Sequence, residues 1–155
     1  MTGRQDDQNA TPYRTATVGG ALYVMDFGAP IGFRLVLQPP ERLTALVTQN
    51  APLYPKEPRG WWATLDLLYD TRGDGPTFEV MQQFLRDRQP PALVAAGVND
   101  EIFPGEVQWQ ILTDLPGAEF HPLDTGHFAL EDQAPEIARL TRDFLGRVLA
   151  PGFGS

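Results

Sequence analysis

The chain has 155 residues, a length that suits one domain burying roughly 70% of its unfolded surface. Its formal net charge of -8 would be repelled by a phosphate backbone or an anionic membrane, so we expect neither nucleic acid nor membrane as a partner. The chain has no cysteine, which excludes disulfides and thiolate metal sites, and we expect a cytoplasmic protein with no metal and no cofactor.

The predicted elements alternate along the chain. Polar residues predict a flexible N-terminal arm over 1–20, one domain over 21–149 and a tail over 150–155. Short apolar stretches predict four strands, at 21–26, 43–49, 92–96 and 118–123. Helical spacing and turn residues predict helices at 30–38, 63–69, 78–88, 105–115 and 131–149.

This alternation predicts parallel pairing and an α/β sheet of about four strands with flanking helices. In open sheets of this kind, reactive groups collect beyond the carboxyl ends of the strands. Asp26 closes the first predicted strand, Asp100 lies just past the third, and His127 lies just past the fourth. We therefore expect these three side chains at one edge of the sheet.

The segment from Leu22 to Pro30 predicts a strand, a sharp turn at Asp26 and an immediate helix. A strand-to-helix turn with a reactive side chain at its apex is a nucleophile elbow. The usual elbow carries serine, whereas this one carries a carboxylate. We therefore expect a hydrolase in which Asp26 attacks a carbon atom and forms an ester with the substrate.

The other two side chains suit the second half of such a reaction. His127 is the expected base for the water that cleaves the ester, because imidazole titrates near neutral pH. Asp100 is expected to orient the imidazole and stabilise its cationic form. The backbone N–H of Phe27 is the expected donor to the oxyanion.

Each of these residues also has a structural interpretation. Asp26 could be a turn residue, His127 could be buried without a chemical role, and Asp100 could cap the following helix. Asp124 is a rival acid, although its position three residues before the histidine is more typical of a turn. The order nucleophile, acid, histidine is that of α/β-hydrolases and favours the triad. Trp109 is expected in the core or a groove, and His121 in a structural position.

Four segments of the sequence resemble the haloalkane dehalogenase and epoxide hydrolase group of α/β-hydrolases. They begin at Val24 (VMDFGAPIGFRL), Pro40 (PERLTALV), Gly97 (GVNDEIFP) and Leu123 (LDTGHFALE). The similarity covers roughly residues 21–50 and 65–149 and corresponds to the C-terminal half of that fold. It implies Asp26 as nucleophile, Asp100 as acid and His127 as base. Asn50, the other place where this group puts its acid, is not acidic here.

The resemblance implies a small-molecule substrate of the epoxide or alkyl-halide type. It departs from the group in lacking a His-Gly-x-Pro loop for the second oxyanion donor and most of the helical cap, of which residues 51–64 are expected to be a remnant. Phe27 also stands where dehalogenases tend to have a halide-binding tryptophan. The alternative prediction is therefore a catalytically silent hydrolase fragment that acts as a binding or assembly module. Ester hydrolysis at the same site is a weaker third possibility.

The predicted sheet also has consequences for assembly. A sheet of four strands leaves the first strand with an apolar edge, and exposed edges favour pairing with another chain. We therefore expect a homodimer or a larger self-associated species formed through this edge.

Overall fold

The computed structural model describes residues 20–38, 40–51 and 76–150. The predicted helix over 63–69 lies outside the described residues. So do the predicted arm, the cap remnant and the tail, apart from the single residues 20, 51 and 150 at their boundaries.

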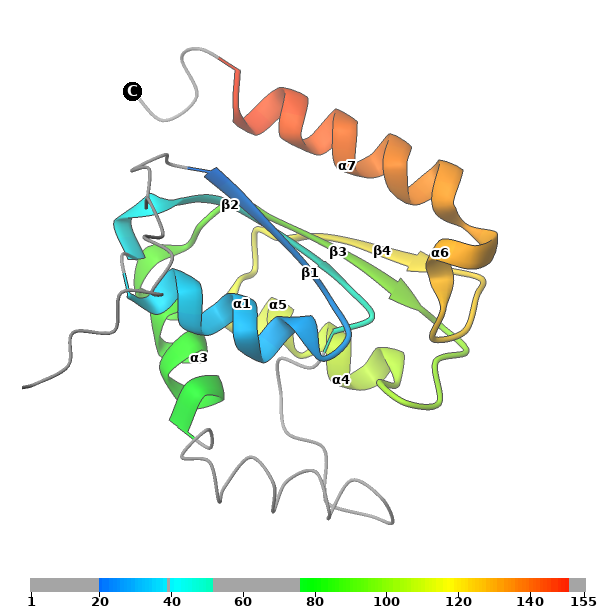
Figure 1. Cartoon of the computed structure of the whole chain (residues 1–155), viewed down its shortest axis with the longest axis horizontal. Helices are drawn as coiled ribbons and strands as arrows, with labels where there is room; N and C mark the ends of the chain where they lie inside the picture. The colour runs from blue at the N-terminus through cyan, green and yellow to red at the C-terminus, as the bar shows by residue number, and fades with distance from the viewer. Residues whose placement is uncertain (1–19, 39, 52–75, 151–155) are drawn as a thin grey trace, which may run out of the picture.

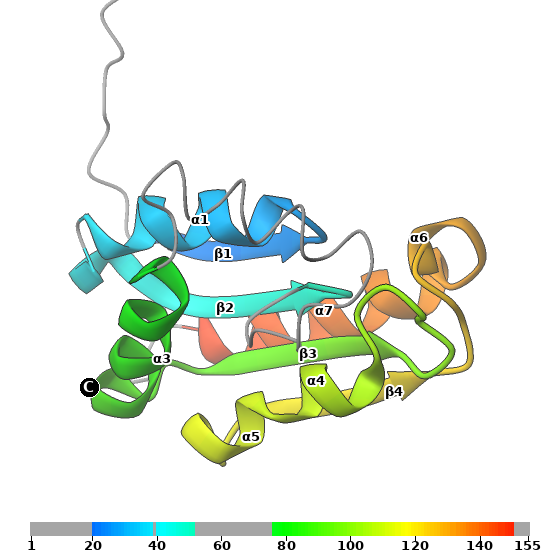
Figure 2. The same ribbon diagram turned by 90° about the horizontal axis from the view of Figure 1, so that it is seen from below.

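The centre of the fold is a four-stranded sheet in which every neighbouring pair is parallel. Its strands are β1 (Gly20–Met25), β2 (Leu43–Gln49), β3 (Ala92–Gly97) and β4 (Glu119–Leu123). They lie side by side in the order of the sequence, as Figure 2 shows. The predicted α/β architecture with four parallel strands is confirmed.

Helices cover both faces of this sheet (Figure 1). One face carries α1 (Gly28–Leu37), α3 (Pro76–Arg88), α4 (Gly105–Trp109) and α5 (Ile111–Asp114). The opposite face carries α7 (Ala134–Val148), which follows the short α6 (Ala129–Asp132). A 3-10 turn, η1 (Pro40–Arg42), leads into β2.

The alternation of side chains along the strands divides the core between these two faces. Leu46 and Val94 pack on the α1 and α3 side with Phe33. Val47 and Leu93 pack on the α7 side, where Phe144 covers them. All six residues of β3 are buried, as expected for a strand with helices on both faces.

Two predicted helices are interrupted. The helix expected over 105–115 breaks at Gln110 into α4 and α5, and the one expected over 131–149 is divided at Gln133 into α6 and α7. Pro135 stands in the first turn of α7, where its missing N–H costs no helical hydrogen bond, so a new helix begins there. None of the helices in the described ranges has the length and apolar character needed to cross a membrane.

Candidate active site

The turn after β1 has the backbone geometry of an elbow. Asp26 has a positive φ of 50°, a conformation that aspartate adopts more readily than most residues. Its backbone N–H donates to the Asn50 carbonyl oxygen at 3.1 Å, and its own carbonyl accepts from Ala29 N at 3.0 Å. These bonds end the strand and start α1 within two residues, so the Asp26 side chain stands at the carboxyl edge of the sheet.

The structure brings the three predicted site residues together at this edge. Nδ1 of His127 lies 3.1 Å from Oδ2 of Asp100, and Nε2 of the same ring lies 3.5 Å from Oδ1 of Asp26. The imidazole therefore lies between two carboxylates. The three residues follow β1, β3 and β4, and parallel strands place their carboxyl ends on one side.

The Asp100 carboxylate is fully buried, and four donors satisfy it. Its Oδ1 accepts the backbone N–H groups of Ile102 and Phe103 at 2.8 and 2.9 Å. Its Oδ2 accepts from the Asn50 amide at 2.6 Å and faces the imidazole. Asp100 thus caps the following turn with one oxygen and faces His127 with the other, so the two interpretations of this residue are compatible.

The contact with Asp100 also assigns the protons on the His127 ring. An ionised carboxylate only accepts hydrogen bonds, so Nδ1 carries a proton when it faces Oδ2 of Asp100. In the neutral ring, Nε2 is then left with its lone pair on the side of Asp26. This tautomer can take a proton from a water molecule that approaches within hydrogen-bond distance of Nε2.

The Asp26 carboxylate is held differently from that of Asp100. Its side chain is 27% exposed, and Oδ1 is a buried atom with no hydrogen-bond partner among the described residues. Nε2 of His127 lies 3.5 Å from Oδ1, which is longer than an ordinary hydrogen bond. An anionic oxygen without donors retains its electron density, which suits it to attack a carbon atom.

Aromatic rings surround the imidazole and form an apolar wall. Phe103 lies 5.3 Å from the His127 ring and 5.8 Å from the ring of Phe27, measured between centroids. Phe128 lies 4.9 Å from His127 in an edge-on contact and is 61% exposed. The side chains beside the reactive groups are therefore largely apolar, which favours an apolar ligand.

Gly97 lets the loops after β3 and β4 approach closely. A Cβ atom at this position would overlap the Gly126 carbonyl oxygen, and it would lie 2.8 Å from the Thr125 carbonyl oxygen and 2.9 Å from Nδ2 of Asn50. Only glycine leaves room for the loop that carries His127 at the distance seen here.

Three other residues discussed from the sequence lie outside the group formed by Asp26, Asp100 and His127. Asp124, the rival acid, is exposed and accepts from the Asn99 amide at 3.0 Å. Trp109 was expected in the core or a groove; it is 60% exposed beside Phe120 and lines a shallow pocket on α4 and α5, so it is not a core residue. His121 is half-buried on β4, with Nε2 3.6 Å from Oε2 of Glu119.

Asn50 is the site residue that sequence reasoning did not use. It follows β2 at the carboxyl edge of the sheet, and this position could have indicated from the sequence that Asn50 lies near the other site residues. It was considered only as a place for an acid, whereas its amide contacts the acid at Asp100.

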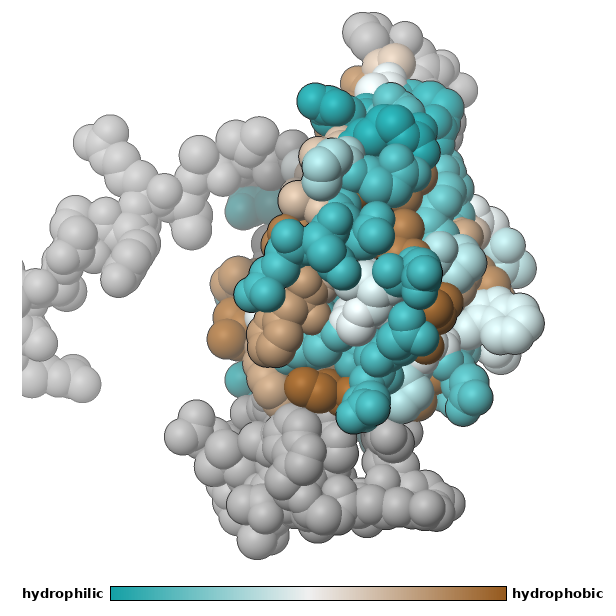
Figure 3. Space-filling view, turned by 90° about the vertical axis from the view of Figure 1, so that its right-hand side faces the viewer, coloured by the Kyte–Doolittle hydropathy of each residue, from teal (hydrophilic) through white to brown (hydrophobic). Residues whose placement is uncertain are grey.

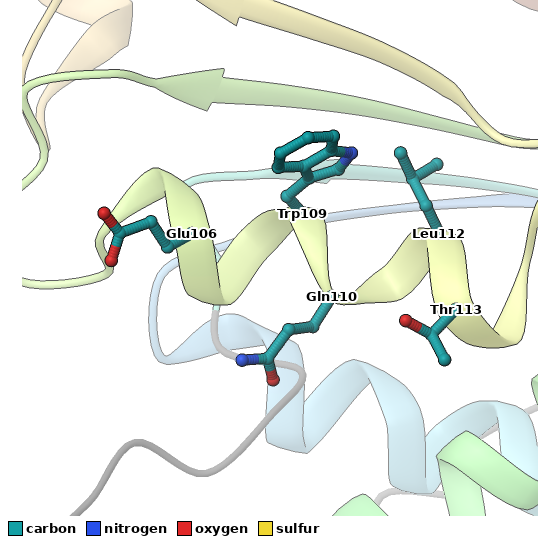
Figure 4. A pocket seen from close by; sticks show the side chains of 5 residues that line it. All are labelled: Glu106, Trp109, Gln110, Leu112 and Thr113. Atoms are coloured by element: carbon teal, nitrogen blue, oxygen red, sulfur yellow. The ribbon is translucent and has the colours of Figure 1, made fainter.

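The surface outside the triad contains a separate shallow pocket of about 350 Å³ on α4 and α5. Trp109 and Leu112 point to one side of these helices and Gln110 and Thr113 to the other, as Figure 4 shows. Neither Asp26, Asp100 nor His127 lines it. The end of the molecule toward which the strands run is a mixture of hydrophilic and hydrophobic surface (Figure 3).

Comparison with known proteins gives one curated relative. The chain is 28% identical to the uncharacterized hydrolase YNR064C of Saccharomyces cerevisiae over 182 residues, which take in 76% of this chain and 63% of the yeast protein. The chain thus spans less than two thirds of that relative. Because the matched stretch is longer than the 155 residues of the chain, the yeast protein contains residues within it that the chain lacks. No protein-family model matches the chain.

Solved structures establish the fold. The enol-lactonase of Burkholderia xenovorans LB400 has a TM-score of 0.62 at 16% identity, covering 84% of this chain and 66% of its own. A hydrolase of Pseudomonas aeruginosa has a TM-score of 0.61 at 17% identity, and the match covers 84% of this chain and 66% of the other. The α/β-hydrolase MGS-MChE2, from a lagoon sediment metagenome, has a TM-score of 0.57 at 21% identity, and the match covers 82% of this chain and 61% of the other. The described strands and helices match a truncated α/β-hydrolase fold, as predicted.

Proposed function

We propose that the protein is a hydrolase of the α/β-hydrolase superfamily in which Asp26 is the nucleophile, His127 the base and Asp100 the acid that orients it. The observation that carries this proposal is the position of the His127 ring, with one nitrogen at Asp100 and the other at Asp26. The elbow geometry at Asp26 and the hydrolase names of the similar proteins support it. The subgroup that fits these residues is that of epoxide hydrolases and haloalkane dehalogenases.

The first step forms an ester between the protein and the substrate. An oxygen of the Asp26 carboxylate attacks a saturated carbon, and the bond from that carbon to an epoxide oxygen or a halogen breaks. An epoxide oxygen takes the electron pair and becomes an alkoxide that stays on the substrate and accepts a proton from water. A halogen takes the electron pair and leaves as a halide ion. Asp26 needs no base for this step, because a carboxylate is already ionised near neutral pH.

The second step releases the product. Nε2 of His127 takes a proton from water, and the water oxygen attacks the carbonyl carbon of the Asp26 ester. The charge that develops on the carbonyl oxygen is stabilised by the backbone N–H of Phe27. The bond between the carbonyl carbon and the ester oxygen then breaks, and the proton on His127 neutralises the alkoxide, which yields a diol or an alcohol. Asp26 is left as a carboxylic acid and returns to the carboxylate when it loses its proton to water.

The residues beside Asp26 narrow the substrate class. Phe27, Phe103 and Phe128 give the site apolar rings, which suits a carbon electrophile with an apolar substituent. The Phe27 side chain has no N–H to donate to a departing halide, which favours epoxides over alkyl halides. Among candidate substrates we therefore rank epoxides with an aromatic or aliphatic substituent first.

Trapping the ester tests the proposal. His127→Gln removes the base of the second step and leaves the first step intact, so a panel of epoxides and haloalkanes should yield a stable adduct on Asp26. Intact-protein and peptide mass spectrometry would locate it. His121→Gln is the matched control, because it changes the other histidine of the chain, and it should turn over substrate without accumulating an adduct.

The outcome also decides between the proposal and a silent binding or assembly module. Absence of an adduct in His127→Gln for a substrate that the wild-type protein turns over would contradict the Asp26 mechanism. Absence of turnover and of adducts across the whole panel would favour the silent module.

A further inference from the structure

We propose that Asn50 is a positioning residue of this site, which holds the acid Asp100 toward His127 and fixes the elbow of Asp26 relative to both. The inference rests on the proposed function for its kinetic consequences. Its structural basis is independent of that function, because it comes from the contacts of a single buried amide.

The backbone of Asn50 connects two strands and the elbow. The residue follows β2, is fully buried and has a φ of 42°, a conformation that asparagine tolerates well. Its N–H donates to the Ala95 carbonyl of β3 at 3.2 Å, and its carbonyl accepts the N–H of Asp26 at 3.1 Å. The turn at Asn50 thus fixes the position of Asp26 relative to the carboxyl end of β3.

The side chain of Asn50 connects the other two loops of the site. Nδ2 donates to Oδ2 of Asp100 at 2.6 Å and to the carbonyl oxygen of Gly126 at 3.2 Å. Gly126 directly precedes His127, so one NH₂ group holds both the acid and the loop of the base. Bonds to a charged acceptor in a buried site are among the strong hydrogen bonds of proteins.

Two neighbouring side chains fix the orientation of this amide. Nε2 of Gln49 donates to Oδ1 of Asn50 at 2.8 Å, which leaves the NH₂ end of Asn50 to face its two acceptors. Tyr23 in turn donates its hydroxyl to Oε1 of Gln49 at 3.2 Å. The Tyr23 phenol is protonated near neutral pH, and burial raises its pKa above the ordinary value.

Asn50 thereby determines which oxygen of Asp100 meets the histidine. The backbone N–H groups of Ile102 and Phe103 hold Oδ1, and Asn50 and His127 share Oδ2. Without the amide, Oδ2 keeps only the imidazole as its donor and the carboxylate is free to rotate. The base would then be oriented less well, which slows ester hydrolysis but not the attack by Asp26.

Two variants keep the unusual backbone of position 50. Asn50→Gly accepts a positive φ and removes the amide, and Asn50→Asp keeps the shape and replaces the donor by a second carboxylate beside Asp100. Two carboxylates so close share a proton. The introduced carboxyl group, when protonated, would donate to Asp100 as the amide does. The Asn50→Asp variant should therefore hydrolyse the ester only at pH values where the shared proton is present and His127 is neutral, and should lose that activity as pH rises and the shared proton leaves.

Histidine NMR tests the positioning without a substrate. The chain has two histidines, so the ring ¹⁵N signals of His127 can be followed with His121 as an internal reference. Asn50→Gly should change the ring ¹⁵N chemical shifts and the tautomer balance of His127 and leave those of His121 unchanged. Asn99→Ala is the matched control, because it removes an exposed amide beside Asp100 that binds Asp124, and both histidine signals should stay as in the wild type.

Single-turnover kinetics on a substrate that forms the Asp26 ester test the consequence. Asn50→Gly should slow ester hydrolysis at least about tenfold, as expected for the loss of one charge-assisted hydrogen bond, and leave the rate of ester formation unchanged. Unchanged His127 signals together with unchanged hydrolysis would overturn the inference. Absence of any ester in the wild-type protein would instead contradict the proposed function, and the NMR result would still decide the positioning.

Discussion

Nδ1 of His127 lies 3.1 Å from Oδ2 of Asp100, a carboxylate whose side chain is fully buried. A buried carboxylate stays ionised only when hydrogen bonds replace its hydration, and four donors around Asp100 do so. In the proposed mechanism, the same charge stabilises the imidazolium that forms when His127 takes a proton from water. Packing and proposed chemistry thus depend on the same four contacts.

Asp100→Asn should therefore reduce both stability and ester hydrolysis. Each oxygen of Asp100 faces two donors, so the NH₂ group of an asparagine, in either orientation, turns two of the four hydrogen bonds into donor–donor contacts. We expect a loss of about 1–3 kcal/mol in the free energy of unfolding, measured by denaturant titration. Hydrolysis of the Asp26 ester should fall by about 100-fold or more. Asp124→Asn, at an exposed acid, should change stability by less than about 0.5 kcal/mol.

Gly97→Ala tests whether the close approach of the two loops is required. The added Cβ would overlap the Gly126 carbonyl and displace the segment before His127. We expect a loss of about 1–3 kcal/mol and slower ester hydrolysis in the folded fraction. Gly146→Ala is the control, because a Cβ there meets open space within α7, and it should stabilise the protein by about 0.5–1 kcal/mol. Equal effects of the two substitutions would contradict this account.

Tyr23 should make stability fall in alkaline solution. Burial raises the pKa of its phenol above the ordinary value of 10.0. Above pH 10.0 the unfolded chain loses this proton while the folded chain retains it, so stability is complete below that pH and declines as pH rises toward the folded-state pKa. Unfolding midpoints measured across this range should fall less in Tyr23→Phe than in the wild type. Parallel curves for the two proteins would show that Tyr23 does not contribute.

Self-association through β1 remains a prediction. In the described sheet β1 pairs only with β2, and Ile31 and Leu35 on the neighbouring α1 are 63% and 61% exposed. We expect light scattering to detect a dimer or larger species whose mass depends on concentration. Ala21→Lys places a charge on the edge strand and should shift the equilibrium toward monomer, whereas Thr113→Lys on α5 should not. A monodisperse monomer of the wild-type chain would contradict the prediction.

Much of the fold could be predicted because its signals are local. The apolar stretch of β2 has the predicted bounds, and the other three strands differ from prediction by a residue at one end or both. Pro122 lies in β4, the last strand of the sheet, where a missing N–H is tolerated. The helix breaks at Gln110 and Gln133 were missed, because hydrophobic spacing continues across them.

The sequence alone determined that Asp26 stands at the apex of the elbow and that Asp100 and His127 follow the carboxyl ends of two further strands. These follow from short stretches in which apolar spacing, glycine and proline set the backbone. The tertiary structure alone decided that Asn50 meets Asp100, since the two are 50 positions apart, and that one carboxylate both caps a turn and faces a histidine. Such contacts depend on the register of neighbouring strands and on the packing of the loops that follow them, which no local pattern encodes.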